Sequence, residues 1–302
     1  MAGITQRDEA PKFVSFLSDF GARDEFVGVC KAVILELAPE VVVIDVTHGV
    51  RPFDVRGGGL SLVRAIQYLP SGIVLAIVDP GVGTERRSVA VEVENGVLIG
   101  PDNGLLAPSV AMLGGAQRVF SLTNPDYQLK THGATFAGRD VMAPAAGHLM
   151  AGIAIEKLGE QVDPSGLVPG LVALPQEGPG GVLVGEVLWV DRFGNAQLNI
   201  DPEMLEAHGV LLGDQIEVQV GGAIRIARWV TTYAEARPAE LCILTDSSGL
   251  LSLVLDKESA AAHLGADAGI PVVIVPMTAA GALSVTEMPI ALRPTTTKVD
   301  PK

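Results

Sequence analysis

The stretch GIVLAIVDPGVGTERR, residues 72–87, decides the fold class of this chain. Its apolar part, 72–78, is rich in β-branched side chains, which is typical of a strand buried on both faces of a parallel sheet. Pro80 and Gly81 then end the strand, because proline cannot donate to a sheet and glycine permits a positive φ. Asp79 is therefore expected at the carboxyl end of a strand, where α/β proteins bind ligands.

Two interpretations of the polar part, 79–87, stay open from these residues alone. In one, Asp79 forms a turn, and Arg86 and Arg87 are solvated surface side chains. In the other, the carboxylate and the two guanidinium groups form a functional site. A phosphate-binding glycine loop is not expected, because Arg86 stands where the third glycine of G-x-G-x-x-G belongs. Motifs elsewhere in the chain must decide.

Composition predicts a compact protein with a small ligand. The chain has 302 residues, 48% of them hydrophobic, which is enough for two domains with buried sheets. A formal net charge of −14 disfavours nucleic acid and anionic membrane surfaces as partners. Two cysteines without paired spacing favour a reducing compartment, so a cytoplasmic location is expected. The polar N-terminus has no apolar signal region, and the chain has no long apolar run. We therefore expect that the protein is neither exported nor inserted in a membrane.

Strand and helix patterns alternate along the first half of the chain, which predicts an α/β layer domain over residues 12–174. The expected strands cover 13–17, 41–46, 73–78, 88–93, 97–99 and 118–122. The expected helices cover 24–37, 59–68, a segment from about residue 105, and 140–151.

A segment rich in proline and glycine, 175–181, predicts a linker or domain boundary. After it, short alternating runs separated by glycine-rich turns predict a smaller all-β, barrel-like C-terminal domain over 180–295. The expected strands there cover 185–190, 215–220, 223–230, 241–244 and 250–255. Residues 1–12 and 295–302 are expected to be tails.

Polar motifs follow several of the expected strands. Asp19 comes directly after the first strand and suits the hydroxyl pair of a ribose, although Ser18 or Asp24 as a helix cap explains the same motif. His48 is more typical of a structural histidine than of a metal ligand, because none of the five histidines pairs with another at metal-ligand spacing. Phe53 is expected either to stack on a base or sugar or to pack in the core.

Further polar motifs lie at other strand ends. The segments 101–104 and 138–140 precede expected helices, and each is an adequate turn or cap by itself. The segment 190–195 interrupts an alternating strand, and 246–249 is expected to be a hairpin tip whose hydroxyl and N–H groups suit a carboxylate. Their repetition at strand ends favours a functional site over unrelated turns.

Together these motifs resemble the S-adenosylmethionine hydroxide adenosyltransferases, a family related to the adenosyl-fluoride and adenosyl-chloride synthases. The resemblance covers residues 12–290 and implies an α/β domain, a barrel-like domain, and a homotrimer that binds S-adenosylmethionine between the N-domain of one subunit and the C-domain of the next. The motifs are SDFG at 18–21, DVTHGV at 45–50, FDV at 53–55, VDPGVGTERR at 78–87, PDNGLL at 101–106, TFAGRD at 135–140, VDRFGN at 190–195 and SSG at 247–249.

The resemblance implies a role for each matched residue. Asp79 and Arg86 match catalytic residues, with Asp79 orienting the attacking water, and an aspartate paired with an arginine is expected to stay ionised at neutral pH. The implied substrate-binding residues are Asp19 at the ribose hydroxyls, Asp24 and Asp191 near the methionine ammonium, Phe53 and Phe136 around ribose and sulfonium, Asn195 at adenine, Ser247 and Ser248 at the methionine carboxylate, and also Gly138 and Phe193.

The implied reaction is attack of water or hydroxide at the ribose C5′ of S-adenosylmethionine, which releases adenosine and L-methionine. Neither a metal nor a cofactor is implied, because a sulfonium leaves as a neutral thioether and the enzyme needs chiefly to hold water in line. Two features favour water over halide. Asp79 stands where the halide-using relatives have tyrosine, and the link between Arg87 and Pro101 lacks their long insertion.

One position departs from the pattern of the family. The hydrolases usually read TFHGRD, whereas Ala137 stands at the histidine position here. His132, five residues earlier, is a candidate replacement for the missing ring. Three functions therefore stay open: hydrolysis with Asp79 and Arg86 alone, binding of S-adenosylmethionine or adenosine with little or no turnover, and, least favoured, adenosyl-halide synthesis.

Overall fold

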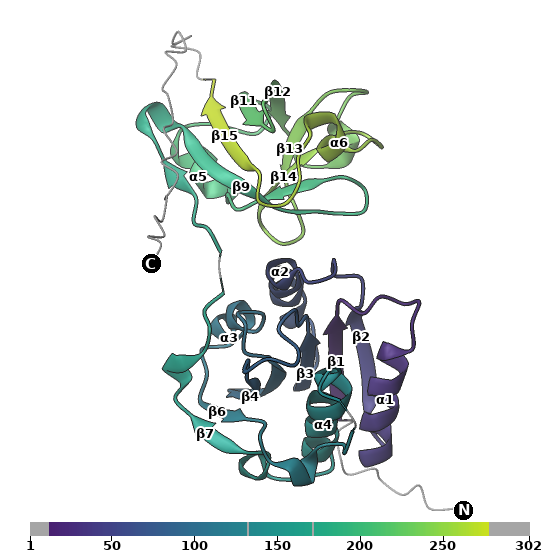
Figure 1. Ribbon diagram of the computed structural model, residues 1–302. Helices are drawn as coiled ribbons and strands as arrows, with labels where there is room; N and C mark the ends of the chain where they lie inside the picture. The colour runs from purple at the N-terminus through teal and green to yellow at the C-terminus, as the bar shows by residue number, and fades with distance from the viewer. Residues whose placement is uncertain (1–11, 132, 171, 278–302) are drawn as a thin grey trace, which may run out of the picture. The chain divides into compact units, whose positions relative to one another are not determined.

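The computed structural model describes residues 12–131, 133–170 and 172–277, which divide into two compact units after Leu174 (Figure 1). The expected tails, the last part of the expected C-terminal domain and His132 lie outside the described residues. No helix in the described ranges is long and apolar enough to cross a membrane.

The first unit is a seven-stranded mixed sheet in the order β2-β1-β3-β5-β4-β6-β7, with helices on both faces. Its strands are β1 (Phe13–Ser18), β2 (Val42–Thr47), β3 (Gly72–Ile77), β4 (Ser88–Val93), β5 (Gly96–Pro101), β6 (Arg118–Ser121) and β7 (Glu160–Val162). Its α-helices are α1 (Phe26–Leu37), α2 (Val55–Ile66), α3 (Ala107–Met112) and α4 (Ala143–Met150). Strands β2, β1, β3 and β5 run parallel, so the predicted α/β layer domain is confirmed.

The central strand β3 is buried on both faces, as its apolar run predicts. Ile73, Leu75 and Ile77 pack in the core cluster under α1 and α4. Val74 and Ala76 pack in the cluster that contains residues of α2 and α3. Because every side chain of this strand meets an apolar layer, the carboxyl end of β3 is fixed firmly where the polar segment begins.

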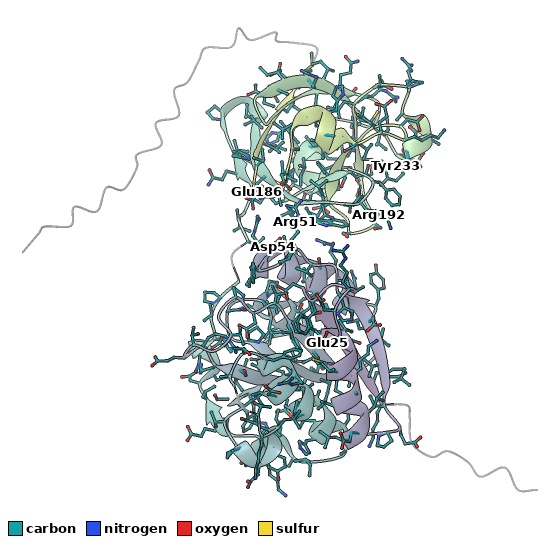
Figure 2. All side chains as sticks on the ribbon, turned by 45° about the vertical axis from the view of Figure 1, so that its right-hand side comes forward. Glu25, Arg51, Asp54, Glu186, Arg192 and Tyr233 are labelled. Carbon is teal, nitrogen blue, oxygen red and sulfur yellow. The ribbon has the colours of Figure 1, made fainter. Side chains whose placement is uncertain are left out.

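Two helices differ from the sequence-based prediction. Helix α2 begins at Val55 instead of Gly59, because the Asp54 carboxylate caps it and accepts a hydrogen bond from the Gly57 N–H at 2.8 Å (Figure 2). The helix expected at 140–151 begins instead as one turn of π-helix, Gly138–Met142, and continues as α4. Glycines in the first turn of α2 and the extra residue of a π-turn both obscure the periodicity on which the prediction depends.

The second unit contains a closed seven-stranded β-barrel, which confirms the predicted barrel-like fold. The ring runs β9-β10-β14-β13-β12-β11-β15 and closes through the pairing of β15 with β9. Its strands are β9 (Leu183–Val190), β10 (Ala196–Leu198), β11 (Gln215–Val220), β12 (Ala223–Trp229), β13 (Cys242–Thr245), β14 (Leu251–Val254) and β15 (Pro271–Pro276). Their inward side chains form one apolar core.

Several short elements of the second unit escaped the sequence-based prediction. They are the strands β10 and β15 and the helices α5 (Pro202–Ala207) and α6 (Ala260–Leu264). Within the segment expected to be a linker, β8 (Gln176–Glu177) pairs with β9. The three residues of β10 and the five or six residues of the two helices are too few for periodicity to identify, although Asp201 and Ser259 cap the helices through their side chains. Strand β15 has six residues, and its continuous apolar run between two prolines shows no alternation.

Candidate active site

The carboxyl edge of the parallel sheet brings two of the predicted site residues together. Strands β1 and β3 pair in register with Ser18 opposite Ile77. Asp19 and Asp79 therefore follow the ends of adjacent strands, and the Asp19 N–H donates to the Ile77 carbonyl at 3.3 Å. The negative charge of Asp19 is close enough to act on the pKa of Asp79. The two carboxylates that sequence motifs assigned to one site are neighbours at this edge.

Asp79 and Arg86 form a buried ion pair across the loop that joins them. The distance from Arg86 Nη2 to Asp79 Oδ2 is 2.5 Å, and the two side chains are only 12% and 7% exposed, respectively. Arg86 Nη1 also donates to the Arg87 carbonyl at 2.6 Å and to Ser88 Oγ at 3.0 Å. Asp79 Oδ1 and Arg86 Nε are buried and have no hydrogen-bond partner among the described residues.

Burial raises the pKa of the Asp79 carboxyl above its ordinary value. The charge and the hydrogen bond of Arg86 and a backbone hydrogen bond from Gly81 lower the pKa, and the nearby charge of Asp19 raises it further. The direction is opposite to the one expected from the arginine pair alone, because removing the carboxylate from water outweighs the attraction of the guanidinium. A carboxylate with a raised pKa and an unpartnered oxygen is a better proton acceptor than an ordinary surface aspartate.

The second arginine of the motif has a structural role. Arg87 Nη2 donates to Asp102 Oδ2 at 2.5 Å, and Asp102 Oδ1 accepts from the Val168 N–H at 2.9 Å. Asn103 Nδ2 donates to the Val78 carbonyl at 2.9 Å, which fixes the backbone directly before Asp79. The motif at 101–104 thus supports the loop that carries the buried pair.

Asp19 also holds a strained residue beside it. The Phe53 N–H donates to Asp19 Oδ2 at 2.9 Å, and Phe53 has a φ of +68°, which is unusual for a residue other than glycine. Its ring is 71% exposed, so core packing does not explain the strain. Backbone strain that surrounding contacts maintain is typical of functional sites.

An aromatic cluster lies near the start of the π-turn. The ring of Phe136 packs edge-on against Phe20 and Phe26, with centroids 5.6 and 5.2 Å apart. The Arg139 guanidinium lies 4.9 Å from the Phe136 centroid. Gly138 is buried, and a Cβ there would lie 3.1 Å from both the Phe20 ring and the Ile77 side chain. The glycine therefore allows this cluster to pack closely on the end of β3.

Ala137 lines the same cavity as Arg86. The cavity has a volume of about 490 Å³ and is open to solvent. Its polar lining includes Thr84 of the motif at 78–87, and also Ser88 and Gln128, which sequence patterns had not singled out. The position where the family usually has histidine thus lies on the Arg86 side of the site, and Ala137 is partly buried there against the core cluster under α1 and α4.

His48 is a satisfied structural residue, as expected. Its Nδ1 lies 2.7 Å from Ser18 Oγ, and its Nε2 lies 2.9 Å from Asp45 Oδ1. Partial burial raises the pKa of Asp45, but hydrogen bonds from Lys31 and His48 lower it below its usual value. The three residues have the types of a serine hydrolase triad, but the two ring nitrogens are exchanged relative to that triad, and Ser18 is fully buried. The three side chains brace the strand end that carries Asp19.

Four of the predicted residues meet in a second cavity, within the barrel unit. Asp191, Asn195, Ser247 and Ser248 line a cavity of about 410 Å³. Asp191 Oδ1 accepts from the N–H groups of Phe193 and Asn195 at 2.8 and 2.9 Å, and Oδ2 accepts from Asn195 Nδ2 at 2.8 Å. The turn at 190–195 is therefore rigid and presents both side chains to the cavity.

Two predicted residues lie apart from these clusters. Phe193 is 73% exposed at the tip of its turn, and it does not line the cavity. Asp24 is exposed in the turn before α1, next to Glu25 (Figure 2).

Sequence patterns missed several residues of the barrel cavity. Trp189, Gln197, Tyr233 and Ser252 line it together with threonines of the 231–232 segment, and Asp246 of the predicted hairpin tip lines it as well. Tyr233, labelled in Figure 2, is 49% exposed. Partial burial raises the pKa of its phenol, and the charges of Asp191 and Asp246 raise it further. Gln197 was the most detectable of these, since it is a polar residue between two apolar ones in a strand.

Comparison with known proteins agrees with this geometry. The family model described as the SAM hydroxide adenosyltransferase N-terminal domain matches residues 14–159, and the model of the C-terminal domain matches residues 185–273. The chain belongs to the SAM hydroxide adenosyltransferase family. The resemblance seen in the sequence motifs is thereby confirmed, and both halves of the family's architecture are present.

Individual relatives within and beside this family carry two kinds of name. A protein of Salinispora tropica named (R)-S-adenosyl-L-methionine hydrolase is 41% identical over 85% of this chain and 95% of its own length. A protein of the same name from Thermus thermophilus is 40% identical over 86% of this chain and 98% of its own. A fluorinase of an Actinoplanes species is 27% identical over 86% and 96%. Similarity is greater to the hydrolases.

The fold of the family is also found among solved structures. An uncharacterised conserved protein of Thermotoga maritima superposes with a TM-score of 0.80 at 31% sequence identity, over 87% of this chain and 99% of that one. The chain therefore shares the family's architecture along nearly its whole described length.

Proposed function

We propose that this protein hydrolyses S-adenosyl-L-methionine to adenosine and L-methionine. The observation that carries the proposal is the buried Asp79–Arg86 pair at the carboxyl end of β3, in which one carboxylate oxygen is left without a partner among the described residues. Hydrolases that are about 40% identical support the choice of substrate, and their names support the (R)-sulfonium epimer.

The reaction is a displacement at the ribose C5′. A lone pair of water oxygen forms the new C5′–O bond while the C5′–S bond breaks, and its electron pair stays on sulfur as the neutral thioether of methionine. The attacking water loses one proton. Since the leaving group is uncharged, no general acid and no metal is required, and positioning of the water supplies much of the rate.

Asp79 orients the water and accepts its proton. Arg86 binds Oδ2, and in this proposal Oδ1, which is buried and has no partner among the described residues, is the oxygen that accepts the proton when the bound substrate brings the water to it. The raised pKa of Asp79 makes it a more effective base than an exposed aspartate, while Arg86 keeps the carboxylate oriented. This role is closer to general base than the water-orienting acceptor that the motif alone suggested.

The remaining predicted residues form two binding sets. In the first unit, Asp19 binds the ribose hydroxyls, Phe53 and Phe136 surround ribose and sulfonium, Gly138 packs beside them, and Asp24 lies near the methionine ammonium. In the second unit, Asp191 lies near the ammonium, Asn195 and Phe193 contact the adenosyl part, and Ser247 and Ser248 bind the methionine carboxylate.

The two sets belong to different subunits of a homotrimer in this proposal, with the first unit spanning 12–174 and the second 180–295. A mixing experiment tests the arrangement. Asp79→Asn and Asp191→Asn subunits are inactive or weak alone, and after unfolding and refolding together they regain activity if each site takes one set from each of two subunits. A monomer by sedimentation, or no regain, contradicts it.

We also propose that the protein acts in the cytoplasm. Its two cysteines are free and buried, in α1 and β13, which suits a reducing compartment. Fractionation of the native host cells, followed by detection of the protein, tests the location.

Turnover of S-adenosylmethionine tests the proposed activity. The purified protein is incubated with the substrate, with and without chloride or fluoride, and the products are separated by chromatography. Adenosine and methionine in equal amounts, unaffected by halide, support hydrolysis. A 5′-halo-adenosine product would instead identify the adenosyl-halide synthase, which the lower identity to fluorinases makes the weakest alternative.

A second candidate function rests on Ala137. This residue lines the cavity beside Arg86 without a polar side chain, so the protein could bind S-adenosylmethionine or adenosine with little or no turnover. Calorimetry that detects binding, together with absent turnover between pH 5 and 9 in buffers chosen for that range, would favour this candidate. Activity that appears only in Ala137→His would identify the missing ring as the cause.

A further inference from the structure

We propose that Asp246 is a positioning residue that sets the Ser247–Ser248 hairpin tip for the carboxylate of the substrate. The inference rests on the proposed function, because it concerns how the barrel cavity recognises the methionine end of S-adenosylmethionine. Sequence analysis placed Asp246 in the hairpin tip 246–249 but gave it no role in the site, and it lines the cavity together with both serines.

One oxygen of Asp246 shapes the tip itself. Oδ1 accepts hydrogen bonds from the N–H groups of Ser248 at 2.8 Å and Leu250 at 3.4 Å. The Asp246 backbone closes the same turn, with its N–H donating to the Leu250 carbonyl at 2.8 Å. The tip joins β13 to β14, and these bonds fix the backbone from which both serine hydroxyls project.

The other oxygen ties the tip to the barrel wall. Oδ2 accepts from Gln197 Nε2 on β10 at 2.7 Å and from Ser252 Oγ on β14 at 2.9 Å. Gln197 and Ser252 are 3% and 2% exposed, respectively. The carboxylate thus accepts hydrogen bonds from the paired strands β10 and β14 and from the tip. Because each of its oxygens is bonded, the orientation of the carboxylate is fixed.

The hydrogen bonds from Ser248 and Leu250 to Oδ1 are sufficient to form the hairpin turn. Gln197 and Ser252 each lie between residues that pack in the apolar barrel core, so their own side chains face the cavity, and burying an amide and a hydroxyl there costs stability unless each is satisfied. Within the part of the chain that the structure describes, the hydrogen bonds that these two side chains donate go to Asp246. Their presence indicates that the exact orientation of the tip matters beyond folding.

Charge explains why the orientation matters. Of the described residues that line the cavity, none is a lysine or an arginine. A substrate carboxylate must therefore be bound by hydroxyl and N–H groups, whose strength depends on their alignment. Asp246 would itself repel that carboxylate if its oxygens faced the cavity, and Gln197 and Ser252 hold them in the network.

Two variants remove the anchoring bonds without touching the serines. Gln197→Met and Ser252→Ala each delete one donor to Asp246 Oδ2. Gln219→Met is the matched control, because Gln219 Nε2 donates to Glu217 Oε1 at 2.8 Å on β11 and does not line the cavity. Circular dichroism and thermal melting establish that each full-length variant is folded, and the smaller Ser252→Ala change carries the test if Gln197→Met does not fold.

Calorimetry with two ligands separates positioning from general damage. For S-adenosylmethionine, each anchoring variant is expected to raise the Kd about tenfold, the effect of one misaligned or lost hydrogen-bond partner. For decarboxylated S-adenosylmethionine, which lacks the group that the serines bind, the Kd should stay within about twofold. Gln219→Met should leave both values unchanged. Asp246→Asn, which keeps an acceptor at the tip, should retain more affinity than Asp246→Ala.

The results distinguish this inference from the proposed function. Equal losses for both ligands, or no loss for either, overturn the positioning role of Asp246 even when the wild-type protein turns over its substrate. Absent turnover with intact binding overturns the proposed hydrolysis and leaves the ligand comparison as the test of Asp246. Absent binding of S-adenosylmethionine to the wild-type protein overturns both.

Discussion

The two regions that contain the predicted site residues differ in how the hydrogen-bonding capacity of their carboxylates is satisfied. In the first unit, Asp79 is buried, one of its oxygens has no partner among the described residues, and burial raises its pKa. In the barrel unit, the carboxylate oxygens of Asp191 and Asp246 all accept hydrogen bonds from their own chain. An incompletely satisfied buried carboxylate is suited to proton transfer, whereas a satisfied one is suited to holding neighbouring groups in place.

The largest expected effect comes from removing the proton acceptor of the first region. Asp79→Asn should lower kcat by about 10³-fold, a typical contribution of a positioned general base. Steady-state turnover of S-adenosylmethionine measures it. Asp126→Asn, an exposed carboxylate in the same unit, is the control and should be without effect. A loss below about tenfold for Asp79→Asn would remove the chemical distinction between the two regions.

Removing a satisfied carboxylate of the second region should affect binding instead. Asp191→Asn should raise KM about 30-fold, since a charged hydrogen bond to the substrate ammonium and the order of the 190–195 turn are both weakened. The value of kcat should change much less than KM. An equal fall in kcat and in kcat/KM would place Asp191 in the chemical step and contradict the division of roles.

Ala137→His should raise kcat about tenfold, the effect of one added hydrogen bond to the water in the transition state. The expectation depends on the position of Ala137 in the cavity beside Arg86. Ala137→Phe, which adds a ring of similar size without a polar atom, is the matched control and should not increase the rate. A gain in both variants would point to packing and not to hydrogen bonding.

The pH dependence sharpens the role of the raised pKa. Activity requires ionised Asp79, so kcat/KM should fall as the pH drops through its pKa, and burial places that fall at higher pH than for an ordinary aspartate. Arg86 lowers this pKa, so Arg86→Gln should move the acid limb to still higher pH. A pH–rate profile of both proteins measures the shift. Movement to lower pH would be incompatible with Asp79 as the titrating base.

The sequence was sufficient for the layout of both domains but not for all of the site. The apolar run 72–78 and the Pro80-Gly81 break predict where β3 ends, and that end positions Asp79. Strong alternation likewise predicts β11 to the residue. The barrel strand β10 escaped because three residues carry too little periodicity, and Gln197 and its contact with Asp246 escaped with it.

The pKa of Asp79 illustrates a second limit of sequence reasoning. The spacing of Asp79 and Arg86 predicts a pair, and the pair exists at 2.5 Å. The direction of the pKa shift, however, depends on how much water the surrounding loops exclude and on the charge of Asp19, 60 positions away in the chain. Neither the exclusion of water nor the charge of a distant residue can be read from the sequence around Asp79.

Isotope labelling during turnover tests the central claim most directly. The wild-type protein is incubated with (R)-S-adenosyl-L-methionine in H₂¹⁸O, and both products are analysed by mass spectrometry. Attack of water at C5′ predicts adenosine that carries one ¹⁸O atom at its 5′-hydroxyl and methionine that carries none. Absent turnover, unlabelled adenosine, or label in methionine would contradict the account.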